Sequence, residues 1–549
     1  MSMPLILLAG LIVRIFNVIR FPILPSAFDP WIHISITREI VENGRFFLDI
    51  YRGGFAFHTL MAFLQTVTGI PLLEMAKYMP IVIGMFSLVP MYVLVKEITN
   101  HEQIALLSTI ILSTMAFDFI YATNQYWPEL TTLSLIALVV LFFIKSIKNP
   151  STKNALVGSL LFIVVTMSHD LSALVLASTL LAIQSLSLLL FKKYTLHSLA
   201  MVVCGLGFLA LWLFTFAPTY MIGLVGQFSN VYLYFAGGFI GYIVLILVLR
   251  KLRQEGDFGR IMISRLVYVL GIILAVVLVA IVLLAFQIPF SQFLNETVSY
   301  YALAAPMWAI IILLTSIGAI ILSYNLHWQS LIILSLTGGI GILFLLTFFL
   351  FLHGYYIIEI ERILAFAFIG LSMICSVGFF TMVKKRNGYG RKILLSSMLV
   401  FMIVPASVWA FPSPEGGLPY LNWNTESEYW FALWGAQHIP QSMAISDWRI
   451  GYILRGFLPY SFGSEAVVIN VILLYPENYP VIQNISQSYE HTIMIIDDWM
   501  IDNGPTQRIS HGPTLPLDQA IVYYTINATY IKIFDNSKEW VYYVIRSST

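Results

Sequence analysis

The chain has 549 residues, of which 59% are hydrophobic and only 10% are charged, and its formal net charge is +1. Soluble domains carry about 25% charged residues, so this composition excludes a soluble enzyme with one anchor and predicts a protein that crosses a membrane many times. The near-neutral charge offers no general electrostatic attraction for nucleic acid. The two cysteines, Cys204 and Cys375, lie in separate apolar runs, which excludes a disulfide framework or a zinc site and favours small buried side chains.

Apolar stretches long enough to span a membrane recur along residues 1–412. A transmembrane helix needs about 20 apolar residues, and this criterion predicts about thirteen helices. We interpret the first stretch as a retained helix rather than a signal peptide, because no small-residue cleavage site follows it. The expected spans are 4–24, 75–97, 103–123, 129–147, 154–170, 171–191, 196–217, 230–250, 266–287, 303–323, 329–352, 363–383 and 392–412.

One shorter apolar stretch, residues 54–72, is expected to behave differently from the spans. It contains His58 and ends next to Pro71. We expect an interfacial helix here, inside a long first outer loop that covers about residues 25–74. This helix would lie on the same side of the membrane as the residues that follow the first span.

The basic residues predict the orientation of the chain, because loops rich in lysine and arginine stay on the cytoplasmic side. If the N-terminus is cytoplasmic, every strongly basic loop falls on that side. These loops lie at Lys96, Lys145–Lys153, Lys192–Lys193, Arg250–Arg265 and Lys384–Lys392. We therefore expect a multi-pass protein of the cell membrane with a cytoplasmic N-terminus.

The character of the chain changes at about residue 413. From there to the C-terminus, turn residues separate short alternating runs such as Val541-Tyr542-Tyr543-Val544, which is typical of strands. The expected fold is thus a polytopic α-helical membrane domain, residues 1–412, followed by an extracytoplasmic, soluble mixed α/β domain, residues 413–549.

Polar and ionisable residues gather in the loops that this topology places outside. Such groups are costly near membrane depth, about 2.5–3.5 kcal/mol each on insertion scales, and usually face protein or water-filled cavities. A shared site at the outer surface would explain them, although loops also collect polar residues for no functional reason. The residues are Asp29, His33, Asn124, Gln125, Glu129, His169, Asp170, Asn295, Glu296, Glu359, Glu361 and Arg362.

Two of these carboxylates stand beside prolines at expected helix starts. Asp29 precedes Pro30, which disfavours the α conformation for the residue before it, so Asp29 is either a helix cap or a functional carboxylate. Glu129 follows Pro128, where a carboxylate also stabilises the helix dipole. His33 lies four residues after Asp29 and would share its helix face.

The other outer residues also have two interpretations. His169 and Asp170 join two spans with almost no loop between them, so we expect both near the surface. Arg362 begins a span, where a cation opposes the helix dipole, so an anionic partner is expected. That partner is either Glu359 or Glu361, or a lipid phosphate.

The segment Phe28-Asp29-Pro30-Trp31, together with Val41-Glu42-Asn43-Gly44, resembles the first outer loop of oligosaccharyltransferase catalytic subunits of the STT3/AglB/PglB type. These proteins belong to the GT-C superfamily of membrane glycosyltransferases. The resemblance covers the whole layout of spans, first outer loop and C-terminal domain. It implies a donor in which a polyprenyl or dolichyl (pyro)phosphate carries the sugar, and transfer at the extracytoplasmic face.

The resemblance also implies roles for individual residues. Catalytic roles fall on Asp29, Glu129 and Glu296, with His33 beside them, and Asp29 and Glu129 would hold Mg²⁺ or Mn²⁺. Arg362 would contact the lipid phosphate. Binding of substrate is further expected of His169, Asp170, Trp448 and Arg449.

Three positions depart from the pattern of these enzymes. The first acidic position of the second-loop motif is Trp127, and the glutamate of the fifth-loop motif becomes Tyr300, with Glu296 one helical turn away. The W-W-D-Y-G signature that reads the acceptor falls on Asp447-Trp448-Arg449-Ile450-Gly451. The acceptor, protein or glycan, therefore stays open.

Two alternatives remain beside an oligosaccharyltransferase-like enzyme. The first is a GT-C enzyme that transfers a single sugar from a polyprenyl monophosphate to an acceptor other than asparagine. The second is a transporter or lipid-glycan flippase, which would place ionisable groups near the middle of the bilayer. Arg14 and Asp118 are the main charges within the spans, and their scarcity argues against transport.

Overall fold

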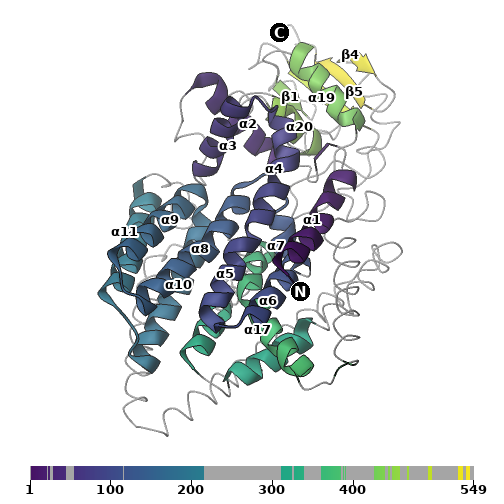
Figure 1. The fold of residues 1–549 in the computed structure, drawn as a ribbon. Helices are drawn as coiled ribbons and strands as arrows, with labels where there is room; N and C mark the ends of the chain where they lie inside the picture. Colours follow the sequence, from purple (N-terminus) through teal and green to yellow (C-terminus); the bar gives the residue numbers. More distant parts are fainter. Residues whose placement is uncertain are drawn as a thin grey trace, which may run out of the picture.

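The structure is a computed structural model, and the part of the chain that it describes is helical over most of its length (Figure 1). It describes residues 2–20, 23–24, 29–44, 55–114, 116–215, 311–323, 327–338, 340, 360–384, 388, 390, 426–438, 443–445, 448–457, 467–468, 492–497, 530–535 and 539–544. Glu296 and the expected spans 230–250, 266–287 and 392–412 lie outside these residues.

The N-terminal part is a bundle of apolar helices. Its labelled helices are α1 (Met3–Arg20), α2 (Asp29–Asn43), α3 (Ala56–Thr68), α4 (Leu72–Phe86), α5 (Leu88–Thr99), α6 (Glu102–Thr114), α7 (Phe117–Ala122), α8 (Pro128–Lys148), α9 (Thr152–Ser168), α10 (Asp170–Phe191), α11 (Leu196–Thr215) and α17 (Ile360–Lys384). Two further apolar helices cover Ile311–Ser323 and Trp328–Gly338.

Five of the described helices are long and apolar enough to cross a membrane, which makes the chain a membrane protein. They are Leu72–Thr99, Pro128–Lys148, Asp170–Leu188, Leu196–Thr215 and Ala365–Lys384, and each overlaps an expected span. The expected span 103–123 is divided into α6 and α7, with Ala116 outside both helices. The predicted total of about thirteen spans stays a prediction.

A buried arginine joins three elements of the bundle. Arg14 of α1 is fully buried, and its guanidinium donates to the hydroxyl of Thr123 at 3.1 Å. The side-chain amide of Asn124 donates to the backbone carbonyl of Arg14 at 3.4 Å. Gly84 of α4 lies against both partners, because a Cβ atom added there would be 2.5 Å from the carbonyl oxygen of Thr123 and 2.8 Å from Nε of Arg14. The first span and α4 thus hold the segment 123–127.

This contact leads to a prediction for Gly84→Ala. The added methyl group meets backbone on one side, so we expect overpacking to destabilise the protein by about 1–3 kcal/mol, measured by thermal unfolding in detergent. Gly207→Ala in α11 is the matched control, because its added Cβ has nothing within 4 Å and alanine favours the helix by about 0.5–1 kcal/mol. Equal unfolding temperatures for the two variants would contradict the tight contact at Gly84.

Loops that the charge pattern assigns to one side of the membrane meet at one end of the bundle. Lys148 of α8 pairs with Glu97 of α5 at 3.0 Å. The ammonium group of Lys193 lies 4.7 Å from the ring centroid of Trp328, and the indole of Trp328 donates to the hydroxyl of Ser187 at 3.1 Å. These basic loops are therefore neighbours in space.

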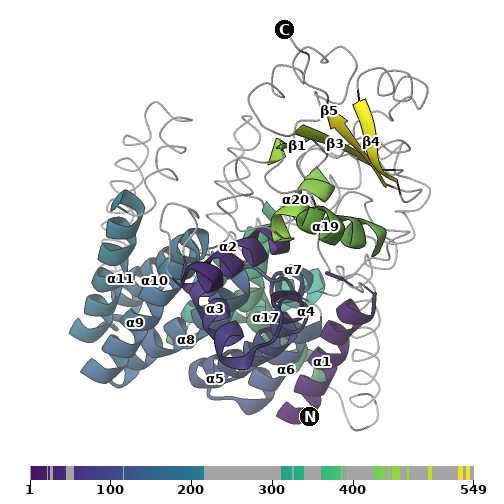
Figure 2. The same cartoon turned by 90° about the horizontal axis from the view of Figure 1, so that it is seen from above.

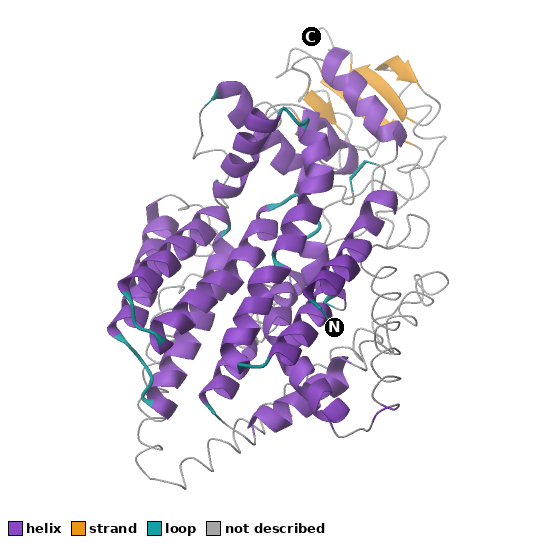
Figure 3. Cartoon of the chain, in the orientation of Figure 1, coloured by secondary structure: helices purple, strands orange, loops and turns teal. Residues whose placement is uncertain are grey.

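The C-terminal segment, residues 426–544, contains α19 (Glu426–His438), α20 (Trp448–Phe457) and all strands of the described chain (Figure 3). The strands are β1 (Met443–Ile445), β2 (Val467–Val468), β3 (Thr492–Asp497), β4 (Tyr530–Asp535) and β5 (Glu539–Val544). They form one sheet in the order β2-β1-β3-β5-β4. β1 is parallel to β2 and β3, whereas β5 is antiparallel to β3 and β4. The alternating run Val541–Val544, expected as a strand, lies in β5.

The view from above shows α20 lying between this sheet and α2 (Figure 2). In the C-terminal segment, α19 and α20 therefore lie on the side of the sheet that faces the helix bundle. The two cysteines are both free, and Cys375 is buried as expected. The expectation of burial was wrong for Cys204, which is exposed because the apolar helix α11 turns this position outward from the bundle.

Candidate functional site

The first part of the candidate site is the start of α2. A capping role for Asp29 predicts a helix that begins at Pro30. The helix begins one residue earlier, at Asp29, and so carries this carboxylate in its first turn. One turn later, His33 is buried, and its Nδ1 lies 2.9 Å from Nε2 of His58 in α3. One proton lies between these two ring nitrogens, so one histidine donates and the other accepts. The pair ties α2 to α3.

A helix, α3, forms within residues 54–72, where an interfacial helix was predicted, and its packing explains why His58 points inward. Phe57, His58, Met61 and Ala62 are buried, whereas Leu60, Phe63 and Val67 are exposed. The helix is followed by its C-cap residue Gly69, which adopts the left-handed conformation with φ of 69° that glycine tolerates. Before the helix, the backbone N–H of Phe55 donates to the carbonyl of Met167 at 2.6 Å, so α3 is fixed to the end of α9.

The segment 123–127 connects the His33–His58 pair to the start of α8. Tyr126 is buried, with its ring centroid 5.2 Å from that of Phe57 in α3. Thr37 of α2 donates to the carbonyl of His33 at 2.7 Å, so the phenol of Tyr126, 3.3 Å away, is the donor to the Thr37 hydroxyl. Burial raises the pKa of Tyr126, which keeps the phenol protonated for this role.

The second part of the site is the first turn of α8. Trp127 is the N-cap residue, Pro128 begins the helix, and Glu129 is 3% exposed. Proline suits this first position because its missing N–H needs no partner there. The indole of Trp127 donates to the carbonyl of Ala122 at 2.5 Å, which folds the segment 123–127 back on itself. The local sequence thus delivers Glu129 into the protein interior.

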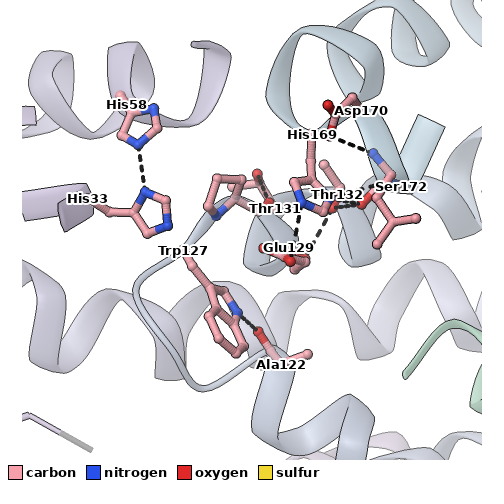
Figure 4. A network of polar contacts seen from close by, with 12 residues as sticks. His33, His58, Ala122, Trp127, Glu129, Thr131, Thr132, His169, Asp170 and Ser172 are labelled. Atoms are coloured by element: carbon pink, nitrogen blue, oxygen red, sulfur yellow. Dashed lines mark hydrogen bonds and ion pairs between the residues drawn. The ribbon is translucent and has the colours of Figure 1, made fainter. Parts of the chain in front are cut away.

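Glu129 is held in a closed set of hydrogen bonds (Figure 4). Its Oε1 lies 3.2 Å from Nε2 of His169. Nδ1 of His169 accepts the backbone N–H of Ser172 at 3.3 Å and lies 2.8 Å from the Ser172 hydroxyl, which in turn lies 2.8 Å from the hydroxyl of Thr132. Because Nδ1 is an acceptor, the imidazole proton is on Nε2, and His169 donates to the carboxylate of Glu129.

His169 and Asp170, which join two predicted spans, are buried within the protein. His169 ends α9 and is the N-cap of α10, and both residues are only 5% exposed. The helix joint is buried because it packs against α8, which supplies Glu129 as a partner, and the backbone N–H of Phe55 bonds to the carbonyl of Met167 just before it. Asp170 accepts the backbone N–H of Leu171 at 2.8 Å.

The structure brings together some of the predicted site residues and leaves others undescribed. His33 and the pair Glu129–His169 lie on either side of the segment 123–127 (Figure 4). Arg362 is in the first turn of α17, and Trp448 and Arg449 begin α20. The side chains of these three residues, and all of Glu296, lie outside the described part.

Sequence reasoning missed four residues that hold the site together: His58, Tyr126, Thr132 and Ser172. His58 stood out as the polar residue of an apolar stretch, but no local signal named His33 as its partner. Thr132 lies three residues after Glu129, and Ser172 three residues after His169. This spacing places each hydroxyl one helical turn from its partner and could have indicated the closed set of hydrogen bonds.

The described residues do not complete a metal site. Among them, no group of three histidine, cysteine, aspartate or glutamate side chains is placed to hold a metal ion. One oxygen of Glu129 already accepts from His169. Mg²⁺ requires near-octahedral oxygen coordination, which Asp29 and Glu129 alone do not provide.

Comparison with known proteins identifies the fold. No family profile matches the sequence, and no curated protein matches it. The oligosaccharyltransferase of Archaeoglobus fulgidus, tethered with an acceptor peptide containing the NVT sequon, aligns with a TM-score of 0.56 and 13% identity over 91% of this chain and 69% of that one. The same archaeal protein, AglB, with an inhibitory peptide and a dolichol-phosphate aligns with a TM-score of 0.55 and 12% identity over 91% and 70%. Its complex with Zn and sulfate aligns with a TM-score of 0.56 and 12% identity over 98% and 73%.

The chain therefore has the fold of a GT-C membrane glycosyltransferase. Within that class it is similar to oligosaccharyltransferase catalytic subunits, as the motif around Asp29 predicts. At 12–13% identity the likeness is one of fold.

Proposed function

We propose that the chain is a membrane glycosyltransferase that transfers a sugar or glycan from a polyprenyl or dolichyl (pyro)phosphate carrier to an acceptor at the extracytoplasmic face. The observation that carries the proposal is the convergence of α2 and α8 on the segment 123–127. It links the helix that begins with Asp29 to the buried carboxylate of Glu129 through Tyr126. Together with a glycosyltransferase fold, two carboxylates at the starts of helices that the segment 123–127 connects support acid–base chemistry.

Asp29 is the proposed general base. It would take a proton from the acceptor nucleophile, or orient it, while the anomeric carbon loses the phosphate of the carrier. Attack opposite the leaving phosphate inverts the anomeric centre. His33, one helical turn from Asp29 and hydrogen-bonded to His58, would hold the helix that carries the base.

Arg362 is the proposed contact of the lipid phosphate. A guanidinium forms paired hydrogen bonds with a phosphate, and it would stabilise the negative charge that grows on the leaving group. The start of α17 brings the backbone of Arg362 to a helix end, where an anion beside the cation offsets the unfavourable helix dipole. Glu296 is proposed to contact the acceptor in addition to Asp29.

Trp448 and Arg449 are proposed to bind the acceptor, in the first turn of α20. The archaeal protein was solved with a sequon peptide, which supports a peptide acceptor here. Arg449 replaces the aspartate of the signature, which favours an acceptor with an anionic group or a glycan. His169 and Asp170 are both buried, so they are proposed to act on the substrate through neighbouring residues and not by direct contact.

A transfer assay separates these candidates. Purified chain would be mixed with extracted lipid-linked sugars and with one of three acceptors: a sequon peptide, the same peptide with glutamine for asparagine, or a glycan. Transfer to the sequon peptide alone supports an oligosaccharyltransferase, and transfer to the glycan or from a monophosphate donor alone supports the single-sugar enzyme. Movement of intact lipid-linked glycan across vesicles without transfer would support a flippase and overturn the proposal.

Metal dependence is a separate prediction. We propose that Mg²⁺ or Mn²⁺ assists the reaction, with Asp29 and Glu129 as two of its ligands and with waters and the phosphate of the carrier completing the coordination. The Zn in the archaeal structure supports a divalent ion. Chelation with EDTA should then abolish transfer, and added Mn²⁺ should restore it. Full activity after chelation, with the metal content checked by mass spectrometry, would contradict this prediction.

A further inference from the structure

The helix that begins with Asp29 is docked against the C-terminal segment through a close contact between Trp31 and α20. Trp31 is 1% exposed, and its ring centroid lies 5.8 Å from that of Phe457. A Cβ atom added to Gly456 would be 2.2 Å from Cε3 of Trp31. Only a glycine lets α20 approach the rigid indole this closely, so the two helices meet without space for a side chain.

Arg38 secures the same contact two turns further along α2. Its guanidinium donates to the backbone carbonyl of Phe457, the last residue of α20, and lies 5.9 Å from the Phe457 ring centroid. The last carbonyls of a helix lack partners within it and carry partial negative charge. Burial lowers the pKa of Arg38, while Glu42 raises it.

The C-terminal segment adds an aromatic side chain to this contact. Tyr429 of α19 lies with its ring centroid 5.5 Å from that of Phe457. Phe457 is therefore in contact with both α2 and α19. A displacement of α20 would have to break the Arg38 bond and separate Phe457 from Trp31.

We propose that Arg38 is a positioning residue, which holds α20 in register with α2 and so couples movement of the C-terminal segment to Asp29. The inference rests on the proposed function and deepens it. Trp31 follows Asp29 by two residues, and α20 runs from Trp448, in the proposed acceptor site, to Phe457, in the contact. A ten-residue helix is about 15 Å long, so this one rigid element joins the two.

The coupling predicts a specific kinetic pattern. If Arg38 acts through α20, its loss should impair use of the acceptor and leave binding of the lipid-linked donor unchanged. Loss of a charge-assisted hydrogen bond changes an equilibrium constant or a rate constant by a factor of about ten to a hundred. We expect Arg38→Gln to lower kcat/KM for the acceptor by this factor and to change KM for the donor less than about twofold.

The test uses the full chain in detergent and two measurements, transfer kinetics and amide hydrogen exchange of residues 450–457. Arg38→Gln should speed exchange in α20, and Arg38→Lys, which can still donate to a carbonyl, should recover part of both the protection and the activity. Gly456→Ala should behave like Arg38→Gln, and the double variant Trp31→Leu Gly456→Ala, which removes the indole ring, should recover. Lys153→Gln, at an exposed lysine in the first turn of α9, is the control for loss of one positive charge.

The outcomes are distinguishable. Faster exchange together with unchanged transfer kinetics would show a contact that only stabilises the fold, and would overturn the inference. Unchanged exchange, or an equal loss for donor and acceptor, would also overturn it. Failure of the proposed function itself would appear differently, as absence of transfer by the unmodified chain with every acceptor.

Discussion

Replacing Asp29 with asparagine is expected to lower transfer about a hundred- to ten-thousandfold and to leave the amount of folded protein unchanged. Asparagine has the size of aspartate but cannot accept the proton of an acceptor nucleophile, and general base catalysis contributes about this factor. The charge also favours the start of α2, so its loss should reduce stability by about 0.3–1 kcal/mol. Single-turnover transfer and thermal unfolding measure the two effects separately.

Glu74→Gln is the matched control for this variant. Glu74 is an exposed carboxylate in the first turn of α4, so its replacement removes the same favourable interaction with a helix dipole. We expect a similar small loss of stability and wild-type transfer. Transfer by Asp29→Asn at more than a tenth of the wild-type rate would exclude Asp29 as the base, and a large loss of folded protein would assign it a capping role.

The parts of the site that could be predicted from sequence are those with a local signal. Asp29-Pro30 and Pro128-Glu129 mark the starts of α2 and α8, because proline is favoured in a first helical turn and a carboxylate stabilises the helix dipole there. A local signal also predicts α8, α10, α11 and α17. Each of these helices is a long apolar run, so its own composition specifies it.

The contacts between these elements could not be predicted, because they join residues far apart in the chain. His33 and His58 lie 25 residues apart on different helices, and Thr37 and Tyr126 are separated by five intervening helices. The burial of His169 depends on Glu129 as its partner, and a polar residue at a helix joint is otherwise expected in water. Without the partner, sequence alone favours the surface.

Two substitutions of His169 are expected to separate its structural role from its effect on Glu129. Nδ1 of His169 caps α10, and Nε2 donates to Glu129. In His169→Asn the side-chain oxygen replaces Nδ1 and keeps the cap, whereas in His169→Gln the amide nitrogen reaches the position of Nε2 and keeps the bond to Glu129. The two variants therefore remove different halves of one side chain.

We expect His169→Asn to retain the cap of α10 and to lower kcat about ten- to hundredfold, the cost of a lost hydrogen bond to a charged group. His169→Gln should lose about 1 kcal/mol of stability with the cap and keep most of the activity. Glu129→Gln should lower kcat at least as much as His169→Asn.

A double-mutant cycle then tests whether His169 acts through Glu129. If it does, adding His169→Asn to Glu129→Gln should cause little further loss, because the interaction is already absent. If the two losses multiply instead, His169 contacts the substrate on its own account, and the closed set of hydrogen bonds around Glu129 is only a means of packing four polar side chains in the interior. The cycle decides between these roles because both side chains are buried and are in direct contact, with Oε1 of Glu129 3.2 Å from Nε2 of His169.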